Sequence, residues 1–221
     1  MKPFLSLVAR DLKLAVRQGG ALGTALGFYM LVVTLLPLGL GADINLLSRI
    51  AAGVLWIALL LSALLSLPRI FASDYEDGSL DILATGPLPL ELVAAAKSLA
   101  HWISTSIPLA LLAPVLGILL NLEIGAYPVL VASMLVGTPA VSSIGAVGAA
   151  LTLRAHRGGL LIALLVLPLY VPTLIFGIAS ISAGLAPDGA TSPFLILTAI
   201  SLAAVVLGPF AAAAALRIQM Q

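Results

Sequence analysis

The stretch IAAGVLWIALLLSALLSLP, Ile50 to Pro68, contains no Asp, Glu, Lys or Arg. A helix needs about 20 apolar residues to cross roughly 30 Å of hydrocarbon, and this stretch has that length and composition. Of the 221 residues of the chain, 62% are hydrophobic and 9% are charged, and the mean hydropathy is +1.22. Soluble domains are about half apolar and about a quarter charged, so this is the sequence of a membrane protein.

Outward from this stretch, the same criterion predicts six membrane spans in one domain over residues 1–221. They cover residues 21–41, 50–68, 98–120, 126–151, 160–181 and 194–216, and as drawn they hold no Asp, Glu, Lys or Arg between their ends. An even number of spans puts both termini on one side. With cytoplasmic termini, Arg49 is the one cation outside, as the positive-inside rule expects. We therefore expect an all-α integral membrane protein with short outer connections.

The first segment, residues 2–18, has an amphipathic pattern rather than the uninterrupted apolar core of a signal peptide. Its polar residues recur at helical spacing, and apolar residues line the opposite face: Lys2, Ser6, Arg10, Lys13 and Arg17 against Phe4, Val8, Leu12 and Val16. This pattern predicts an N-terminal interfacial helix on the inner membrane surface, with its cations near anionic lipid headgroups. A simple topology anchor and a mechanical role both remain open.

Several function classes are excluded or disfavoured by what the sequence lacks. Without cysteine there is no disulfide, no thiolate metal site and no covalent haem attachment. A net charge of +1 from scattered cations argues against nucleic acid as a partner. The absence of charge within the drawn spans disfavours an ion-driven transporter. No Walker-type motif is present, so the chain has no Walker-type ATPase site of its own and needs a separate subunit that hydrolyses ATP.

Small residues four apart predict faces where helix backbones approach closely. The pairs are Gly23 and Gly27, Ser133 and Gly137, Ser142 and Ala146, and Gly145 and Ala149. These faces are predicted to pack either within the subunit or between subunits. Prolines within the spans, Pro108 and Pro114 among them, predict helix kinks.

The inner connection FASDYEDGSLDILATG, Phe71 to Gly86, gathers four acidic residues in a chain that has nine. Ser73 as N-cap and Glu76 as its capping-box partner predict a cytoplasmic helix over about 73–86, ending before the prolines that follow Gly86. Asp74, Asp77 and Asp81 then fall on one helix face. A capped, solvated loop and a protein-docking element are both compatible with this pattern.

Several stretches together resemble a known family. The run DYEDGSLDILATGPLPLELVAAAK looks like the first cytoplasmic loop of ABC-2-type exporter permeases. More narrowly, the whole chain resembles the haem exporter B family, the CcmB-type permeases of cytochrome c maturation. The stretches that carry this resemblance include FASDYEDGSLDIL, PLPLELVAAAKSLAHW (Pro87 to Trp102), LVGTPAVSSIGAVGAALTL (Leu135 to Leu153) and LPLYVPTLIFG (Leu167 to Gly177). Where the family usually has a basic and acidic pair, this chain has Ala72 and Ser73, so that pair's contact is not carried over.

The resemblance implies a function, partners and site residues. It implies two copies of this permease in the bacterial inner membrane, docked on two copies of an ATPase subunit, with a tryptophan-rich haem-handling subunit and a small single-span subunit. ATP would be bound by the partner alone, and haem would be the ligand handled, without covalent attachment. The residues assigned to ATPase coupling are Asp74, Glu76, Asp77, Gly78, Leu80 and Asp81. In this interpretation the segment Asp74 to Leu83 moves as a rigid lever.

Within the family picture, the permease either exports haem to the periplasm or transmits force that releases a haem-loaded chaperone. The residue pair His101 and Trp102 is the candidate contact for haem or a partner, although Trp is also an ordinary interface anchor. His156 lies in a basic inner loop. Because the chain has few histidines and aromatics, we favour force transmission. The alternatives are export of a lipid-linked glycan or amphipathic drug, and a scaffold role.

Overall fold

A computed structural model describes residues 2–41, 43–155, 158–184 and 191–220, and its regular structure is helical throughout these ranges. The long helices are α2 (Gly20–Leu40), α3 (Ile44–Leu64), α6 (Leu90–His101) continued by a π-helix (Trp102–Ser106) and α7 (Ile107–Leu119), α8 (Tyr127–Leu151), α9 (Gly158–Gly184) and α10 (Thr191–Gln219). The shorter ones are α1 (Lys2–Gln18), α4 (Arg69–Glu76), α5 (Ser79–Thr85) and a 3-10 turn (Ile124–Ala126). The residues His156 and Arg157 and part of the last outer connection, 185–190, lie outside the described residues.

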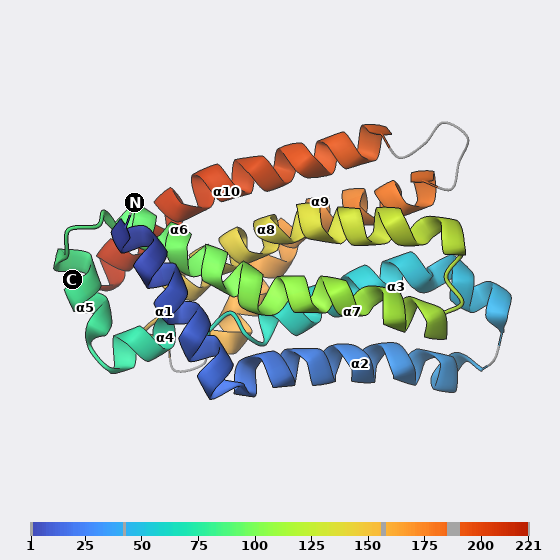
Figure 1. Cartoon of the computed structure of the whole chain (residues 1–221), viewed down its shortest axis with the longest axis horizontal. Helices are drawn as coiled ribbons and strands as arrows, with labels where there is room; N and C mark the ends of the chain where they lie inside the picture. Colours follow the sequence, from blue (N-terminus) through green and yellow to red (C-terminus); the bar gives the residue numbers. More distant parts are fainter. Residues whose placement is uncertain (1, 42, 156–157, 185–190, 221) are drawn as a thin grey trace.

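The six predicted spans are confirmed as six helices that are long and apolar enough to cross a membrane. They run side by side along the long axis of the molecule, and both chain ends lie at the same end of the bundle, together with α4 and α5 (Figure 1). This arrangement agrees with cytoplasmic termini and a cytoplasmic α4–α5 segment. We refer to this end as the inner end.

Two of the helices are longer than the spans drawn from the sequence, and their extra turns carry charge. Helix α3 begins at Ile44 and includes Arg49, and α6 begins at Leu90 and includes Glu91 and Lys97. These charged residues lie outside the spans as drawn, in helix ends that extend past them. The hydropathy criterion placed the ends at the charges, but hydrogen-bonded helices continue beyond the hydrocarbon into the interface.

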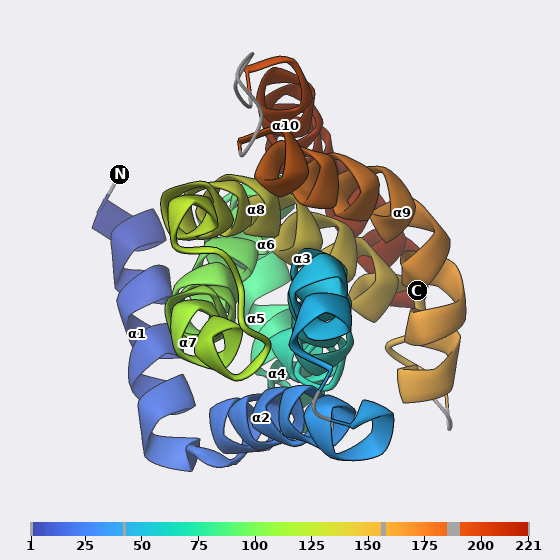
Figure 2. The ribbon, with the colours of Figure 1, turned by 90° about the vertical axis from the view of Figure 1, so that its right-hand side faces the viewer.

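Helices α3 and α8 form the interior of the bundle, whereas α2 is the span most open to the surroundings (Figure 2). Glycines allow the close packing of this interior: a Cβ at Gly145 would lie 2.3 Å from Leu67, and one at Gly137 would lie 2.7 Å from Trp56. The small-residue face of α8 therefore packs within the subunit. Gly23 and Gly27 on α2 have no neighbouring atom within 4 Å of a built Cβ.

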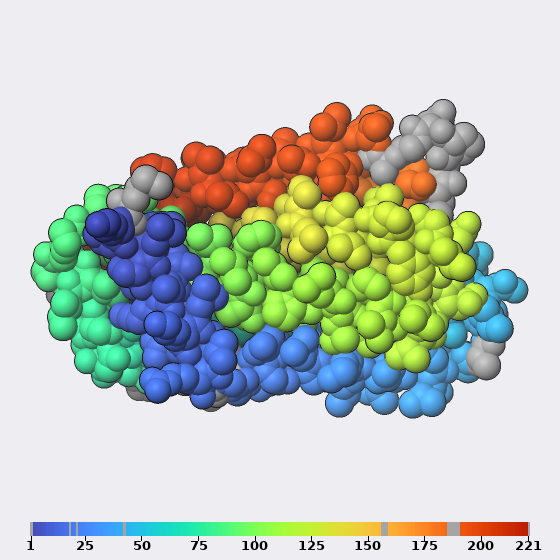
Figure 3. All heavy atoms as spheres, in the orientation of Figure 1, coloured from blue at the N-terminus to red at the C-terminus, as the bar shows by residue number. Residues whose placement is uncertain are grey.

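The predicted N-terminal helix is confirmed as α1, which crosses the inner end of the bundle and lies against α6 (Figures 1 and 3). Its inward face agrees with the predicted apolar face at Phe4, Val8 and Leu12, but not at Val16. Leu7 and Val8 are buried, whereas Val16 is 80% exposed. Arg10, predicted from its spacing to lie near the lipid headgroups, forms an ion pair with Asp74 on α4.

Candidate functional site

The inner connection folds as two short helices joined at a glycine, not as one helix. Helix α4 begins at Arg69, directly after Pro68, and ends at Glu76; Gly78 then has φ 75°, and α5 begins at Ser79. The predicted N-cap at Ser73 is therefore wrong, since proline is well suited to open a helix and does so earlier in the chain. The predicted end before Gly86 is confirmed. Because Gly78 adopts a left-handed conformation, the segment is a bent pair and not a straight lever.

This bend separates the three aspartates that were predicted to share one face. Asp74 is buried, whereas Asp77 and Asp81 are exposed. Asp77 accepts a hydrogen bond from the Ser79 backbone N–H at 2.9 Å and so holds the start of α5. Hydrogen bonding from Ser79 lowers the pKa of the Asp77 carboxyl below its ordinary value, so Asp77 is charged at neutral pH. The exposed carboxylates and the buried one must therefore act differently.

Asp74 belongs to a cluster of four charges that we call the inner ion-pair cluster: Arg10, Asp11, Asp74 and Lys97. Arg10 Nη2 lies 2.5 Å from Asp74 Oδ1, and Arg10 Nε lies 3.0 Å from Asp11 Oδ1. Lys97 Nζ lies 3.0 Å from Asp11 Oδ2 and also pairs with Asp74. The Lys97 and Asp74 side chains are 3% and 5% exposed. Two cations and two carboxylates thus connect α1, α4 and α6, with Lys97 and Asp74 buried and Arg10 partly exposed.

A buried set of charges of this kind fixes geometry, because loss of one member leaves another charge without compensation. Asp74 also accepts a hydrogen bond from the Ser79 hydroxyl at 3.0 Å, which connects the cluster to the first residue of α5. Leu80 is buried beneath α5, whereas Ile82 is 73% exposed. The bent pair is therefore anchored to the bundle through Asp74 and Leu80 and presents Asp77, Asp81 and Ile82 outward.

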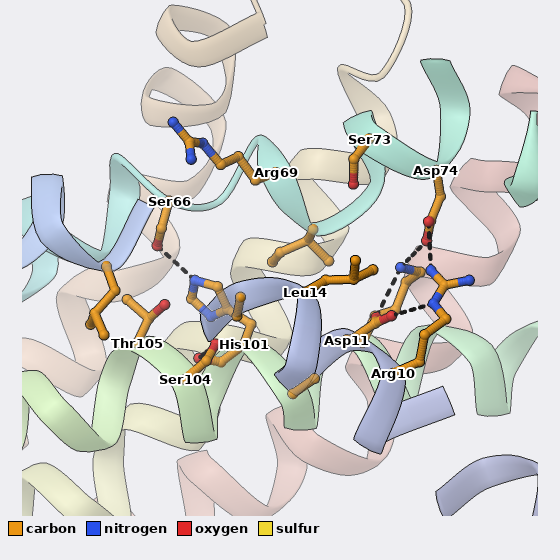
Figure 4. A pocket seen from close by; sticks show the side chains of 15 residues that line it. Arg10, Asp11, Leu14, Ser66, Arg69, Ser73, Asp74, His101, Ser104 and Thr105 are labelled. Atoms are coloured by element: carbon orange, nitrogen blue, oxygen red, sulfur yellow. Dashed lines mark hydrogen bonds and ion pairs between the residues drawn. The ribbon is translucent and has the colours of Figure 1, made fainter. Parts of the chain in front are cut away.

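Beside the cluster lies a cleft between α1, α4 and α6, with about 690 Å³ of empty space that includes its open mouth (Figure 4). We call it the inner cleft. The ion-pair cluster lies on one side of it, and His101 lies on the other, with Ser66 pointing toward the imidazole. The guanidinium of Arg69 points away from the cluster. The cleft thus joins a charged side to a side lined with hydroxyls.

His101 is buried and is bound through both ring nitrogens. Its Nε2 lies 2.8 Å from Ser66 Oγ, and its Nδ1 lies 3.0 Å from Ser142 Oγ, which is in turn 3.1 Å from Ser106 Oγ. Ser66 lies in the turn between α3 and α4, Ser142 lies on α8, and Ser106 ends the π-helix. The imidazole therefore ties three elements together in this structure.

Trp102 opens the π-helix and donates its indole N–H to Thr138 Oγ1 on α8 at 3.0 Å. The widened turn ends at Ser106, two residues before Pro108, which lacks the N–H that a regular α-helix would use. Such π-helical turns are frequent at functional sites. The predicted irregularity in the third span therefore takes the form of a π-helix beside His101 and Trp102.

The sequence interpretation did not find Asp11, Ser66 or Ser142 as site residues. A signal existed for Asp11, because it lies three residues after Val8 and four before Ala15, on the side of the helix that faces the bundle. An acid among inward-facing positions indicates a buried cationic partner. No comparable signal marks Ser66 or Ser142, since serine is common in membrane helices.

Among the residues that the structure describes, no group of three His, Asp or Glu side chains is arranged to hold a metal ion. The site consists of the exposed acidic surface of α4–α5, the inner ion-pair cluster and the inner cleft.

Comparisons with known proteins point to one family over nearly the whole chain. The family model described as "CcmB protein" matches residues 2–219. The chain is 58% identical over 216 residues to "Heme exporter protein B" of Paracoccus denitrificans, covering 98% of this chain and 99% of that protein. It is 52% identical over 216 residues to the protein of that name from Rhodobacter capsulatus, with the same coverage. It is 42% identical over 218 residues to the one from Escherichia coli K12, covering 99% of each.

Proposed function

The chain belongs to the CcmB family, and from this premise we propose that it is the inner-membrane permease subunit of a haem exporter in cytochrome c maturation. The observation that carries the proposal is the identity of 42% to 58% with relatives named Heme exporter protein B, over nearly the full length of both chains. Six apolar helices support a multi-pass membrane location. The chain acts as a transporter subunit and not as an enzyme in itself.

We further propose that a separate ATPase subunit docks on the exposed side of α4–α5. Asp77, Asp81 and Ile82 offer two carboxylates around an apolar side chain, a combination suited to a partner with a basic rim and an apolar pocket. The inner ion-pair cluster then carries movement from α4 to α1 and α6. A homodimer of this chain, a tryptophan-rich subunit and a single-span subunit remain part of the same proposal.

For haem itself, the contacts of His101 support force transmission over conduction. Both ring nitrogens are engaged by Ser66 and Ser142. An axial haem ligand needs one nitrogen free, so haem ligation would require one of these two hydrogen bonds to break. We therefore propose that this subunit drives haem handling by its partners, with the His101 and Trp102 pair holding the third span in place.

Reversing both exposed charges, Asp77→Lys together with Asp81→Lys, is expected to reduce co-purification of the ATPase subunit at least about tenfold. Each reversal replaces attraction by like-charge repulsion at the docking surface. The measurement is the yield of ATPase recovered with the tagged permease from membranes.

The matched control is Glu123→Lys, an acidic residue in the connection between α7 and α8, at the other end of the bundle. It is expected to leave ATPase recovery unchanged. Equal membrane insertion of all variants must accompany the result. Full ATPase recovery by the double reversal would show that the docking surface is misassigned.

The variant His101→Gln tests force transmission against haem ligation. Gln retains polar atoms for the serine contacts but is not a usual haem ligand, so we expect ATP-dependent release of the periplasmic haem chaperone to stay within about threefold of wild type. The measurement is chaperone release in membranes that contain the whole complex. Loss of release together with loss of a haem absorbance signal from the purified permease would favour conduction.

A further inference from the structure

We propose that the inner cleft binds the phosphate of a membrane phospholipid from the cytoplasmic leaflet. This site is distinct from the docking surface and does not depend on the species that the complex handles. The charges lining the cleft are three cations, Arg10, Arg69 and Lys97, and two carboxylates, Asp11 and Asp74, which leaves one cation in excess. An anion is therefore the ligand that the cleft favours electrostatically.

The excess cation is identifiable as Arg69. The ion pairs of the cluster use Arg10 and Lys97, and within the described ranges no acidic side chain pairs with Arg69. Arg69 is exposed, and its guanidinium points away from the cluster. Its Nη1 lies 3.5 Å from the position of a Cβ built on Gly20, at the first turn of α2. A guanidinium with free N–H groups matches the oxygens of a phosphate.

A hydroxyl in the cleft lining adds a second observation. Thr105 lines the cleft, and no hydrogen bond joins its hydroxyl to a residue that the structure describes. This hydroxyl is not among the buried polar atoms that lack a partner, so it is open to the cleft and can bond water or a polar ligand there. The first turn of α2 likewise lacks a side-chain cap.

The location of the cleft selects a lipid over a free anion. The cleft lies where the interfacial helix α1 turns into α2, and its lining also includes Leu14 and Leu22. Beyond it, α2 exposes Leu31, Leu35 and Leu38 along the span. A phosphate held near Arg69 would therefore have apolar surface below it for acyl chains. The combination of anion site and apolar track is typical of a bound phospholipid.

The test is native mass spectrometry of the full chain in mild detergent, titrated with phosphatidylglycerol. We expect Arg69→Gln to raise the apparent Kd for the tightest lipid about tenfold, because a charge-assisted hydrogen bond is lost. Thr105→Val should raise it by about threefold, as expected for a neutral hydrogen bond. Arg17→Gln is the matched control, because Arg17 is an exposed arginine on α1 outside the cleft lining. The Kd of this variant for the lipid should stay within about twofold of the wild-type Kd.

Two further experiments test whether the ligand is a lipid or a free phosphate, and whether the charge at position 69 is what binds it. Inorganic phosphate in large excess should leave lipid binding unchanged; displacement would assign the site to a free anion and overturn the proposal. Arg69→Lys, which keeps the charge, should bind more lipid than Arg69→Gln. Equal Kd values for Arg69→Gln, Arg17→Gln and wild type would also overturn the proposal.

Discussion

Replacing Lys97 by Met is expected to destabilise the protein by about 3 to 5 kcal/mol, because it leaves a buried carboxylate without its main cation. The Lys97 and Asp74 side chains are 3% and 5% exposed, and Asp11 is 14% exposed. Arg10 alone would then face both carboxylates, from a side chain that is 36% exposed. We expect α1 and α4 to loosen from α6, with a lower melting temperature in detergent and faster proteolysis after Arg17.

The double variant Lys97→Met with Asp74→Asn distinguishes a charge effect from a packing effect. Removing the stranded carboxylate should restore part of the lost stability, so the double variant should be more stable than Lys97→Met alone. Lys13→Met, at an exposed position on α1, is the matched control and should change stability by less than about 0.5 kcal/mol. A double variant that is less stable than the single one would contradict the ion-pair account.

Replacing Gly177 by Leu is expected to have the second large effect, on folding itself. A Cβ at Gly177 would lie 2.5 Å from two ring atoms of Trp56, and a Cβ at Gly137 would lie 2.7 Å from the same indole. Trp56 is fully buried, so its ring has no free volume to move into. Overpacking a tight core costs about 1 to 3 kcal/mol, and a leucine at this contact should exceed that range.

The measurement is the yield and melting temperature of the purified chain, compared with Gly39→Leu as control. Nothing lies within 4 Å of a Cβ built on Gly39, so that variant should fold like wild type. The smaller change Gly177→Ala should already lower the melting temperature, because the Cβ itself makes the clash. A wild-type melting temperature for Gly177→Leu would mean that α3 and α9 separate easily and that this packing is not as tight as described.

The acidic segment illustrates how far the sequence interpretation reached. Its composition correctly indicated a structured inner element that ends before Gly86. The face shared by Asp74, Asp77 and Asp81 was wrong, because helical spacing holds only while the helix continues, and Gly78 breaks it. The same aspartates therefore divide into one buried ion-pair partner and two exposed charges.

Lys97 and His101 illustrate a different limit. In the sequence, Lys97 is the residue just before the span drawn over 98–120, and the pair His101 and Trp102 was a candidate for haem or partner contact. Their roles depend on residues far away in the chain: Lys97 meets Asp11 across 86 positions, and His101 meets Ser142 across 41. No local pattern encodes such pairings.

The sequence by itself determined the membrane class, the number of spans, the shared end at which both termini lie and the family. It did so because the bilayer imposes length, apolar composition and charge asymmetry on each segment separately, so that local sequence is enough to reveal them. Only the tertiary structure decided which charges are buried and where the cleft lies. Those features depend on how α1, α4 and α6 meet, and a charge buried by one helix is stable only when another helix brings its counterion.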